Sequence, residues 1–172
     1  MVFTEKTVPN LHVVLYQPEI PDNTGAVGRT CVAAGADLYL VKPLGFQLDH
    51  RRIARAGMDY WKHLHCRTVD DWNDLTLKLP GHRWYFTKKA IKLYTEVRYC
   101  PGDILVFGNE SRGLPEFILD AAAEQCLKIP IAPEARSLNL SVSVGIALFE
   151  AKRQIDNFSK MSEKPDYRFE SR

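Results

Sequence analysis

The sequence predicts an α/β protein with a mostly parallel β-sheet and helices on both faces. Short apolar segments bounded by turn residues alternate along the chain with segments of helical periodicity, the order typical of parallel sheets. The chain has 172 residues, of which 45% are hydrophobic and 26% charged, so it can bury a core of its own. We expect one domain over residues 1–155 and a polar extension over residues 156–172.

Six short apolar segments are expected to form the strands. They are LHVVLYQ (11–17), DLYLVKP (37–43), HLHCRTV (63–69), RWYFTKK (83–89), DILVFGN (103–109) and CLKIPI (126–131).

Four segments are expected to form helices. The first follows Asp22 or Asn23 as its N-cap and ends at Gly35. The others are HRRIARAGMDYW (50–61), DDWNDLTLKL (70–79), and LPEFILDAAAEQ (114–125) with Pro115 in its first turn.

One further segment, SLNLSVSVGIAL (137–148), gives conflicting signals. Its apolar and polar residues alternate strictly, which predicts a strand. However, the helix-forming residues FEAKRQ (149–154) follow it directly, and Ser137 or Asn139 could cap a helix. Periodicity alone favours the strand.

Several classes of protein are excluded or disfavoured. No apolar run approaches the ~20 residues of a membrane span, and the first ten residues do not resemble a signal peptide, so we expect a soluble, cytoplasmic protein. The four cysteines lie about thirty residues apart without a CxxC pair, a spacing that favours reduced thiols and no metal.

Positive charge is concentrated although the net charge is only +2. One basic cluster lies between His50 and Arg67, and a second lies between His82 and Lys92. Such clusters indicate a surface that faces a polyanion such as RNA, although an ordinary solvated helix face would have the same composition.

Three glycine-rich or polar loops are candidates for a binding site. They are NTGAVGRT (23–30), GNESRGLP (108–115) and IPIAPEARSLNLS (129–141). None of them is GxGxxG or GxxxxGK[ST], which disfavours a dehydrogenase or an NTPase. Taken singly, the second loop could be a tight turn into a helix, and Arg29 could pair with a surface acid instead of a phosphate.

In this order, the three loops resemble the motifs of the SPOUT class of S-adenosylmethionine-dependent RNA methyltransferases. The resemblance covers most of the chain, from about Leu11 to Gln154. The segment YQPEIPDNTGAVGRTCVAAGADLYLVKPLGF (16–46), with RRIARAGMDYW (51–61), is similar to the tRNA wobble-position 2′-O-methyltransferases, the TrmL group. The resemblance therefore implies 2′-O-methylation of the ribose at position 34 of tRNA, on cytidine or a modified uridine.

The resemblance also implies which residues form the site. S-adenosylmethionine would be held by three loops, mostly through backbone groups; the matching residues are Phe86, Thr87, Gly108, Ile129, Ser137 and Leu138. The polar positions of the active site match Arg29, Asn23, Glu110 and Asn139. Because a guanidinium stays protonated, Arg29 is better suited to hold a phosphate and to stabilise negative charge than to act as a base. The reaction requires no metal.

Finally, the resemblance implies a C-terminal trefoil knot, a homodimer, and a helix in place of a strand within residues 137–154. Arg51, Arg52 and Arg55 would contact the anticodon arm of tRNA through its phosphates. Two other functions remain open: methylation of ribosomal RNA or of another tRNA position, and RNA binding by a knotted protein that has lost catalysis.

Overall fold

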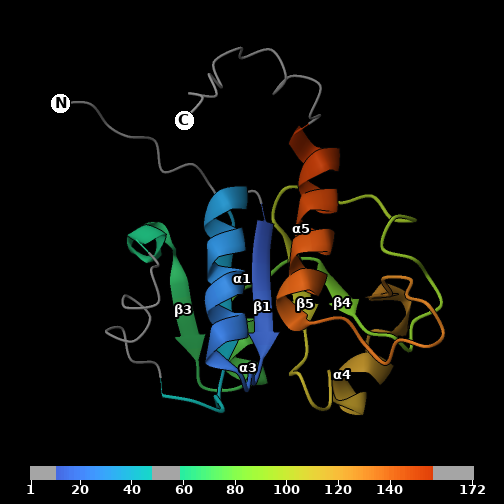
Figure 1. The fold of residues 1–172 in the computed structure, drawn as a ribbon, viewed down its shortest axis with the longest axis horizontal. Helices are drawn as coiled ribbons and strands as arrows, with labels where there is room; N and C mark the ends of the chain where they lie inside the picture. The colour runs from blue at the N-terminus through green and yellow to red at the C-terminus, as the bar shows by residue number, and fades with distance from the viewer. Residues whose placement is uncertain (1–10, 48–58, 157–172) are drawn as a thin grey trace, which may run out of the picture.

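The sheet has six strands, all parallel to their neighbours, in the order β3-β2-β1-β5-β4-β6 (Figure 1). The computed structural model describes residues 11–47 and 59–156. The strands are β1 (Leu11–Tyr16), β2 (Asp37–Val41), β3 (Cys66–Val69), β4 (Arg83–Phe86), β5 (Asp103–Phe107) and β6 (Cys126–Leu127). All six predicted strands are confirmed, but β6 is only two residues long, because beyond Leu127 the chain pairs with the segment at Lys92–Tyr94 instead of β4: the Lys128 N–H donates to the Lys92 carbonyl.

The helices occupy most of the predicted places. They are α1 (Pro21–Ala34), the 3₁₀ helix η1 (Asp59–His63), α3 (Trp72–Lys78), α4 (Glu116–Asp120), the 3₁₀ helix η2 (Ala123–Gln125) and α5 (Leu140–Asp156). Most of the helix predicted over residues 50–61 lies outside the described residues.

The boundaries of α1 and α4 differ from the prediction, and α3 (Trp72–Lys78) is shorter than the predicted 70–79 at both ends. Helix α1 begins at Pro21 with Ile20 as its N-cap, so neither Asp22 nor Asn23 caps it; the fixed φ of Pro21 suits the first helical position. Its predicted end is confirmed, with Gly35 in the left-handed conformation at φ +72°. Helix α4 ends at Asp120 instead of residue 125, because the chain must turn through η2 to enter β6; Pro115 is its N-cap.

The strand predicted from the alternation in residues 137–148 is wrong, and the helix that the family resemblance implied is confirmed as α5. The buried residues Leu140, Val144 and Leu148 follow one another at helical spacing. The pattern alternates because apolar residues also stand away from the buried stripe of the helix: Val142 is 49% exposed, and Ile146 is only partly buried.

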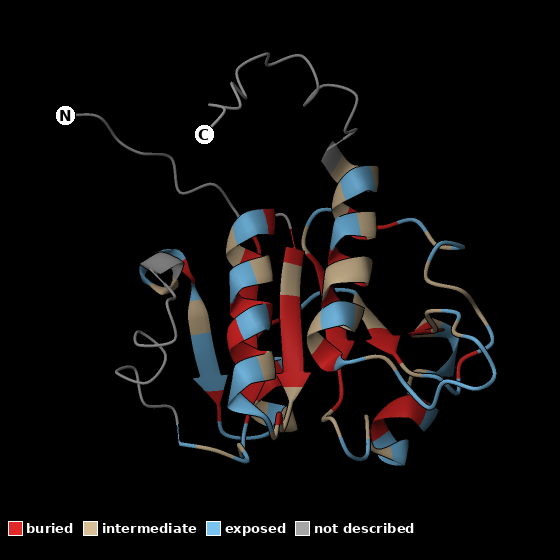
Figure 2. Ribbon diagram, in the orientation of Figure 1, coloured by how far each residue is buried: buried red, intermediate tan, exposed pale blue. Residues whose placement is uncertain are grey.

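The two faces of the sheet carry separate cores. The central strand β1 lies between them and is mostly buried (Figure 2). Helices α1 and α5 lie side by side over one face, where Val27 and Leu148 pack on strand residues such as Leu105. Helices α3 and α4 cover the other face through Leu75 and Ile118. The predicted arrangement with helices on both faces is therefore confirmed.

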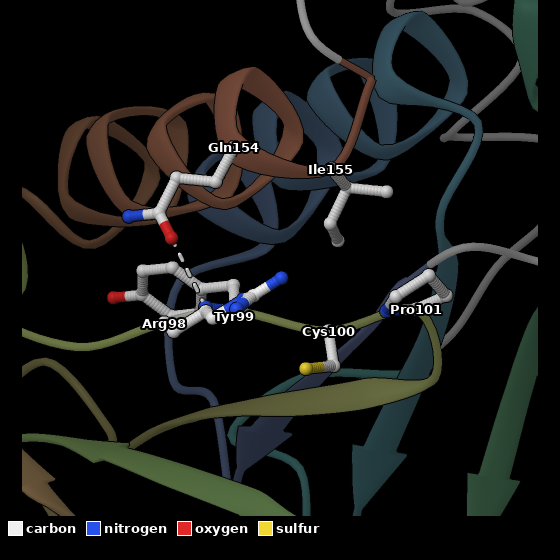
Figure 3. A pocket seen from close by; sticks show the side chains of 6 residues that line it. All are labelled: Arg98, Tyr99, Cys100, Pro101, Gln154 and Ile155. Atoms are coloured by element: carbon white, nitrogen blue, oxygen red, sulfur yellow. Dashed lines mark hydrogen bonds between the residues drawn. The ribbon is translucent and has the colours of Figure 1, made fainter.

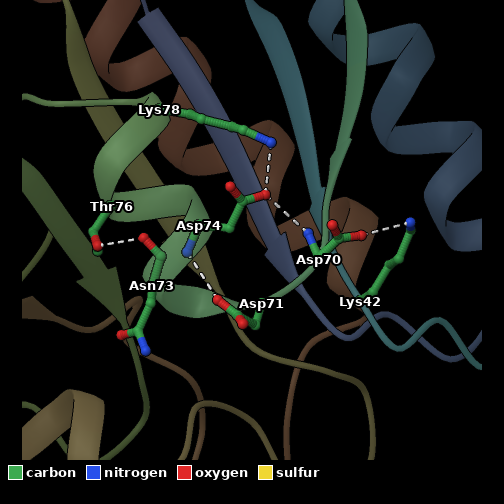
Figure 4. A network of polar contacts seen from close by, with 7 residues as sticks. All are labelled: Lys42, Asp70, Asp71, Asn73, Asp74, Thr76 and Lys78. Atoms are coloured by element: carbon green, nitrogen blue, oxygen red, sulfur yellow. Dashed lines mark hydrogen bonds and ion pairs between the residues drawn. The ribbon is translucent and has the colours of Figure 1, made fainter.

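The ends of β2 and β3 are joined by an exposed polar network (Figure 4). Lys42 Nζ lies 2.9 Å from Asp70 Oδ1, and the Asp70 N–H donates to Asp74 Oδ2 at 3.1 Å. Asp71 caps α3 by accepting from the Asp74 N–H, and a hydrogen bond from Lys78 lowers the pKa of Asp74. Because these charges are solvated, the network contributes little to stability and mainly fixes the turn into α3.

The four cysteines are free thiols, of which Cys31 and Cys126 are buried. Burial raises the pKa of Cys31, and it raises the pKa of Cys66 to about 12. These two thiols therefore stay protonated at neutral pH. No helix within residues 11–47 and 59–156 is long and apolar enough to cross a membrane.

A half-buried histidine, His12 at the start of β1, lies at the opposite end of the strands from the loops that follow them. Among the residues that the structure describes, His12 Nδ1 has no hydrogen-bond partner. It lies 3.8 Å from Asp37 Oδ2, and the two side chains are 13% and 11% exposed. Burial lowers the pKa of His12, helped by Arg67, and the Asp37 carboxylate opposes this only in part.

We predict that His12 makes the fold less stable in mild acid. Its pKa in the folded protein lies below the value of about 6.5 in the unfolded chain, so its contribution is complete above pH 6.5 and is lost as the pH falls through the folded value. Thermal unfolding between pH 7.5 and 5.5 should show a smaller loss of Tm in His12→Gln than in wild type. His63→Gln, at an exposed position, should keep the wild-type dependence.

The turn after β5 depends on two glycines for different reasons. A Cβ on Gly108 would lie 2.0 Å from the carbonyl carbon of Gly113, whereas a Cβ on Gly113 would meet nothing within 4 Å but would sit at φ +74°. We predict that Gly108→Ala costs about 3 kcal/mol or more, because the backbone must move apart. Gly113→Ala should cost only about 1–2 kcal/mol for its conformation. Urea unfolding midpoints measure the difference, and equal losses would contradict this interpretation.

Candidate active site

Three loops meet at the carboxyl edge of the sheet, where ligands bind in parallel α/β proteins. Strands β5, β4 and β6 are neighbours, so the residues that follow them lie side by side. Phe86 ends β4, Gly108 follows β5, and Ile129 lies two residues beyond β6. The Thr87 N–H donates to the Leu127 carbonyl at 2.9 Å and ties the loop after β4 to the end of β6.

A chain of polar side chains connects the three candidate loops. The Glu110 carboxylate accepts a hydrogen bond from Asn23 Nδ2 at 2.9 Å, and Asn23 Oδ1 accepts one from Asn139 Nδ2 at 2.9 Å. Asn139 Oδ1 in turn accepts the N–H groups of Ser141 and Val142 and so caps α5. The structure therefore brings together three of the four predicted catalytic residues: Asn23, Glu110 and Asn139.

Both ends of this chain fix the direction of its hydrogen bonds. An ionised Glu110 can only accept, and the free N–H groups at the start of α5 can only donate. Each amide between them must therefore direct its NH₂ toward Glu110 and its oxygen toward α5. With each amide oxygen already accepting, the second N–H of each NH₂ is the group that Asn23 and Asn139 can offer to a ligand.

Glu110 is held tightly by the segment before α1. Its Oε2 accepts the Glu19 N–H at 2.9 Å, and its Oε1 accepts the Ile20 N–H at 3.3 Å as well as the Asn23 amide. Both carboxylate oxygens are therefore used within the protein. The geometry favours a positioning role for Glu110 over proton transfer to or from a substrate.

Arg29, the fourth predicted catalytic residue, lies on a different side of α1. It is exposed and follows Asn23 by six residues, which on an α-helix is about 9 Å along the axis and about 120° around it. Its side chain therefore leaves the helix in a different direction from that of Asn23.

The predicted cofactor residues combine apolar walls with available backbone donors. The Phe86 ring stacks on Phe107 at 4.6 Å within the core, and Gly108 is buried. The N–H groups of Ile129, Ser137 and Leu138 have no acceptor in the described part of the chain. A ligand at this edge would thus meet backbone donors beside apolar side chains. The space next to Gly108 is filled by the protein's own backbone at Gly113.

The predicted RNA-binding residues Arg51, Arg52 and Arg55 lie outside the described residues. In the second basic cluster, most cations are engaged within the protein. Arg83 donates to the Leu79 and Gly81 carbonyls, Lys89 pairs with Glu116, and Lys92 donates to the Glu124 carbonyl. This cluster therefore offers fewer charges to RNA than its composition indicates.

Sequence reasoning missed Glu19. Its carboxylate accepts the hydroxyl of Ser111 at 2.7 Å and the Ser111 N–H at 3.1 Å. The available signal was its place just before Pro21, since a carboxylate is favoured at the start of a helix. That position did not reveal a partner 92 residues away along the chain.

A separate hollow of about 230 Å³ lies at the far end of the sheet, before β5 begins (Figure 3). Tyr99 lines it and donates its N–H to Gln154 Oε1 at 3.1 Å, while its hydroxyl donates to the Tyr94 carbonyl. It is remote from the converging loops. Within the described ranges, no three His, Cys, Asp or Glu side chains are grouped so as to hold a metal ion.

Known proteins are similar to this chain in sequence and in fold. The tRNA (cytidine(34)-2′-O)-methyltransferase of Escherichia coli is 42% identical over 147 residues, which cover 84% of this chain and 94% of that protein. A structure that gives insights into 2-OH methylation of C/U34 on tRNA is 46% identical, with a TM-score of 0.80, over 86% of this chain and 97% of that one. The AdoMet-bound rRNA methyltransferase of Sinorhizobium meliloti is 30% identical, with a TM-score of 0.74, over 84% of this chain and 56% of its own length.

The profile of the SpoU rRNA methylase family matches residues 10–149, a span that contains all three candidate loops. The chain therefore belongs to the SpoU rRNA methylase family.

Proposed function

We propose that this protein transfers a methyl group from S-adenosylmethionine to the ribose 2′-oxygen of the wobble nucleotide, position 34, of tRNA. The observation that carries the proposal is the 42% identity to the Escherichia coli tRNA (cytidine(34)-2′-O)-methyltransferase, which extends over 84% of this chain and 94% of that protein. The substrate base would be cytidine or a modified uridine, in agreement with the related structure of C/U34 methylation.

The loops after β4, β5 and β6 suit S-adenosylmethionine. The available N–H groups of Ile129, Ser137 and Leu138 would read the adenine and ribose, as backbone groups do in pre-formed cofactor pockets. The methyltransferase of Sinorhizobium meliloti, 30% identical, binds AdoMet. When bound, S-adenosylmethionine supplies the methyl group.

The polar residues would act on the RNA. Asn23 and Asn139 direct N–H donors away from their shared hydrogen bond, and such donors bind a ribose or phosphate oxygen. Arg29 would hold a neighbouring phosphate and stabilise negative charge as the 2′-hydroxyl loses its proton. Glu110 would fix the amides and so align the reacting oxygen.

The same proposal includes a homodimer, a C-terminal trefoil knot, a cytoplasmic location and a single catalytic domain over residues 1–155. The apolar side chains of Val142 and Phe149, exposed on α5, support the homodimer because a second copy could cover them. The anticodon arm would bind across the dimer, through Arg51, Arg52 and Arg55.

The experiment that tests this function is transfer of labelled methyl to tRNA from a strain that lacks the gene, with the product mapped by mass spectrometry. A 2′-O-methyl group at position 34 is the expected result. Methylation of another tRNA position or of ribosomal RNA would replace the substrate but keep the reaction. Cofactor binding without transfer to any RNA would instead identify a binding protein.

We predict that Arg29→Lys lowers kcat at least about tenfold and leaves the Kd for S-adenosylmethionine within about twofold, because a lysine cannot form paired hydrogen bonds to phosphate. Steady-state kinetics and calorimetry measure the two quantities. Arg98→Lys, an exposed arginine at the far edge of the sheet, is the matched control and should behave as wild type. Near-normal turnover of Arg29→Lys would exclude a bidentate role.

We also predict that Arg51→Ala together with Arg55→Ala raises the KM for tRNA about tenfold. The slope of log binding constant against log salt concentration should become about two units less steep, because fewer phosphate contacts release fewer counterions. Binding measured at several salt concentrations gives both values. Lys78→Ala, on helix α3, controls for the loss of a positive charge and should leave the KM for tRNA near wild type. An unchanged KM would place the RNA footprint elsewhere.

A further inference from the structure

Two carboxylates at the carboxyl edge hold each other's segments. Glu110 accepts the N–H groups of Glu19 and Ile20, and Glu19 accepts the N–H and the hydroxyl of Ser111. The two acids lie 91 residues apart along the chain, yet each binds the backbone that carries the other. Four hydrogen bonds therefore join the segment before α1 to the turn after β5.

Because each acid binds the segment that carries the other, neither segment can move without straining these hydrogen bonds. The turn keeps its own internal hydrogen bonds, from the Arg112 and Gly113 N–H groups to Asn109. If Glu19 released Ser111, however, the link between this turn and the segment before α1 would rest on the Glu110 carboxylate alone. That carboxylate also fixes the Asn23 amide, and through it the Asn139 amide at the start of α5. A displacement of the turn would therefore pass directly to both amides.

We propose that Glu19 is a positioning residue: with Ser111 it forms a latch that holds Glu110 where it sets the direction of the Asn23 and Asn139 amides. The inference rests on the proposed function for the identity of the reaction, but not for the existence of the latch. Glu19 itself is half-buried, and Ser111 uses both oxygens of its carboxylate. Its effect on catalysis passes through Glu110.

The chemistry of the latch predicts an asymmetry between glutamine and alanine. In Glu19→Gln, the remaining oxygen accepts the Ser111 N–H, and the new NH₂ donates to the Ser111 hydroxyl, which can reverse its role. Both hydrogen bonds survive. In Glu19→Ala both are lost, and in Glu19→Gln with Ser111→Ala the NH₂ has no partner.

We expect Glu19→Ala to lower kcat for tRNA methylation about tenfold, with KM for tRNA within about twofold, because misplaced amides affect alignment more than affinity. Glu19→Gln should retain kcat within about threefold of wild type. Adding Ser111→Ala removes the hydroxyl partner but keeps the backbone N–H, so it should lose part of this rescue and give a kcat between those of Glu19→Gln and Glu19→Ala. Glu116→Gln, an exposed carboxylate on the adjacent α4, is the control and should leave kcat unchanged. Tm is measured for each variant to separate alignment from general destabilisation.

Hydrogen exchange tests the latch without any RNA. The Ser111 amide donates to Glu19, so exchange across residues 108–113 should quicken at least about fivefold in Glu19→Ala and stay near wild type in Glu19→Gln and Glu116→Gln. If the wild-type protein methylates no tRNA, the proposed function fails, while the exchange result still decides the latch. Unchanged exchange, an equal loss of kcat in the Gln and Ala variants, or a loss that follows Tm alone would overturn it.

Discussion

The Glu110 carboxylate is the contact on which the candidate site depends. It accepts three N–H groups from residues 19–23 although it stands after β5, more than eighty residues further along the chain. Because one carboxylate accepts from several donors, it ties the turn after β5 to the segment at the start of α1. The amides of Asn23 and Asn139 take their directions from it, and the N-terminus of α5 completes the same chain of hydrogen bonds. Motifs far apart in sequence thus become one polar surface.

The parallel sheet supplies the rigid base for that surface. Because β5, β4 and β6 are adjacent and parallel, the loops that follow them must emerge at one edge. Burial on both faces fixes the register of these strands, and α1 and α5 pack over the face whose core includes Phe86, Phe107 and Leu140. The backbone donors of the third loop then stand beside an apolar floor, an environment suited to a cofactor with an aromatic base.

The prediction from sequence succeeded where local patterns agree with the fold. The six strands and the Gly35 end of α1 follow from apolar runs and turn residues. It failed for residues 137–148, because outward apolar side chains such as Val142 imitate strand alternation. It also failed at the start of α1, where Asn23 is used by Glu110 instead of capping the helix. A residue's hydrogen-bond partner across the fold has no local signature.

The sequence by itself determined the alternation of strands and helices, the three candidate loops and the family resemblance, because these are properties of residue order and local geometry. Only the tertiary structure decided that Asn23, Glu110 and Asn139 form one directed chain, that most of the second basic cluster is occupied internally, and that Glu19 holds Ser111. The physical reason is that the hydrogen-bond partners in this site lie in segments that follow different strands. Only the folded backbone brings them within 3 Å of one another.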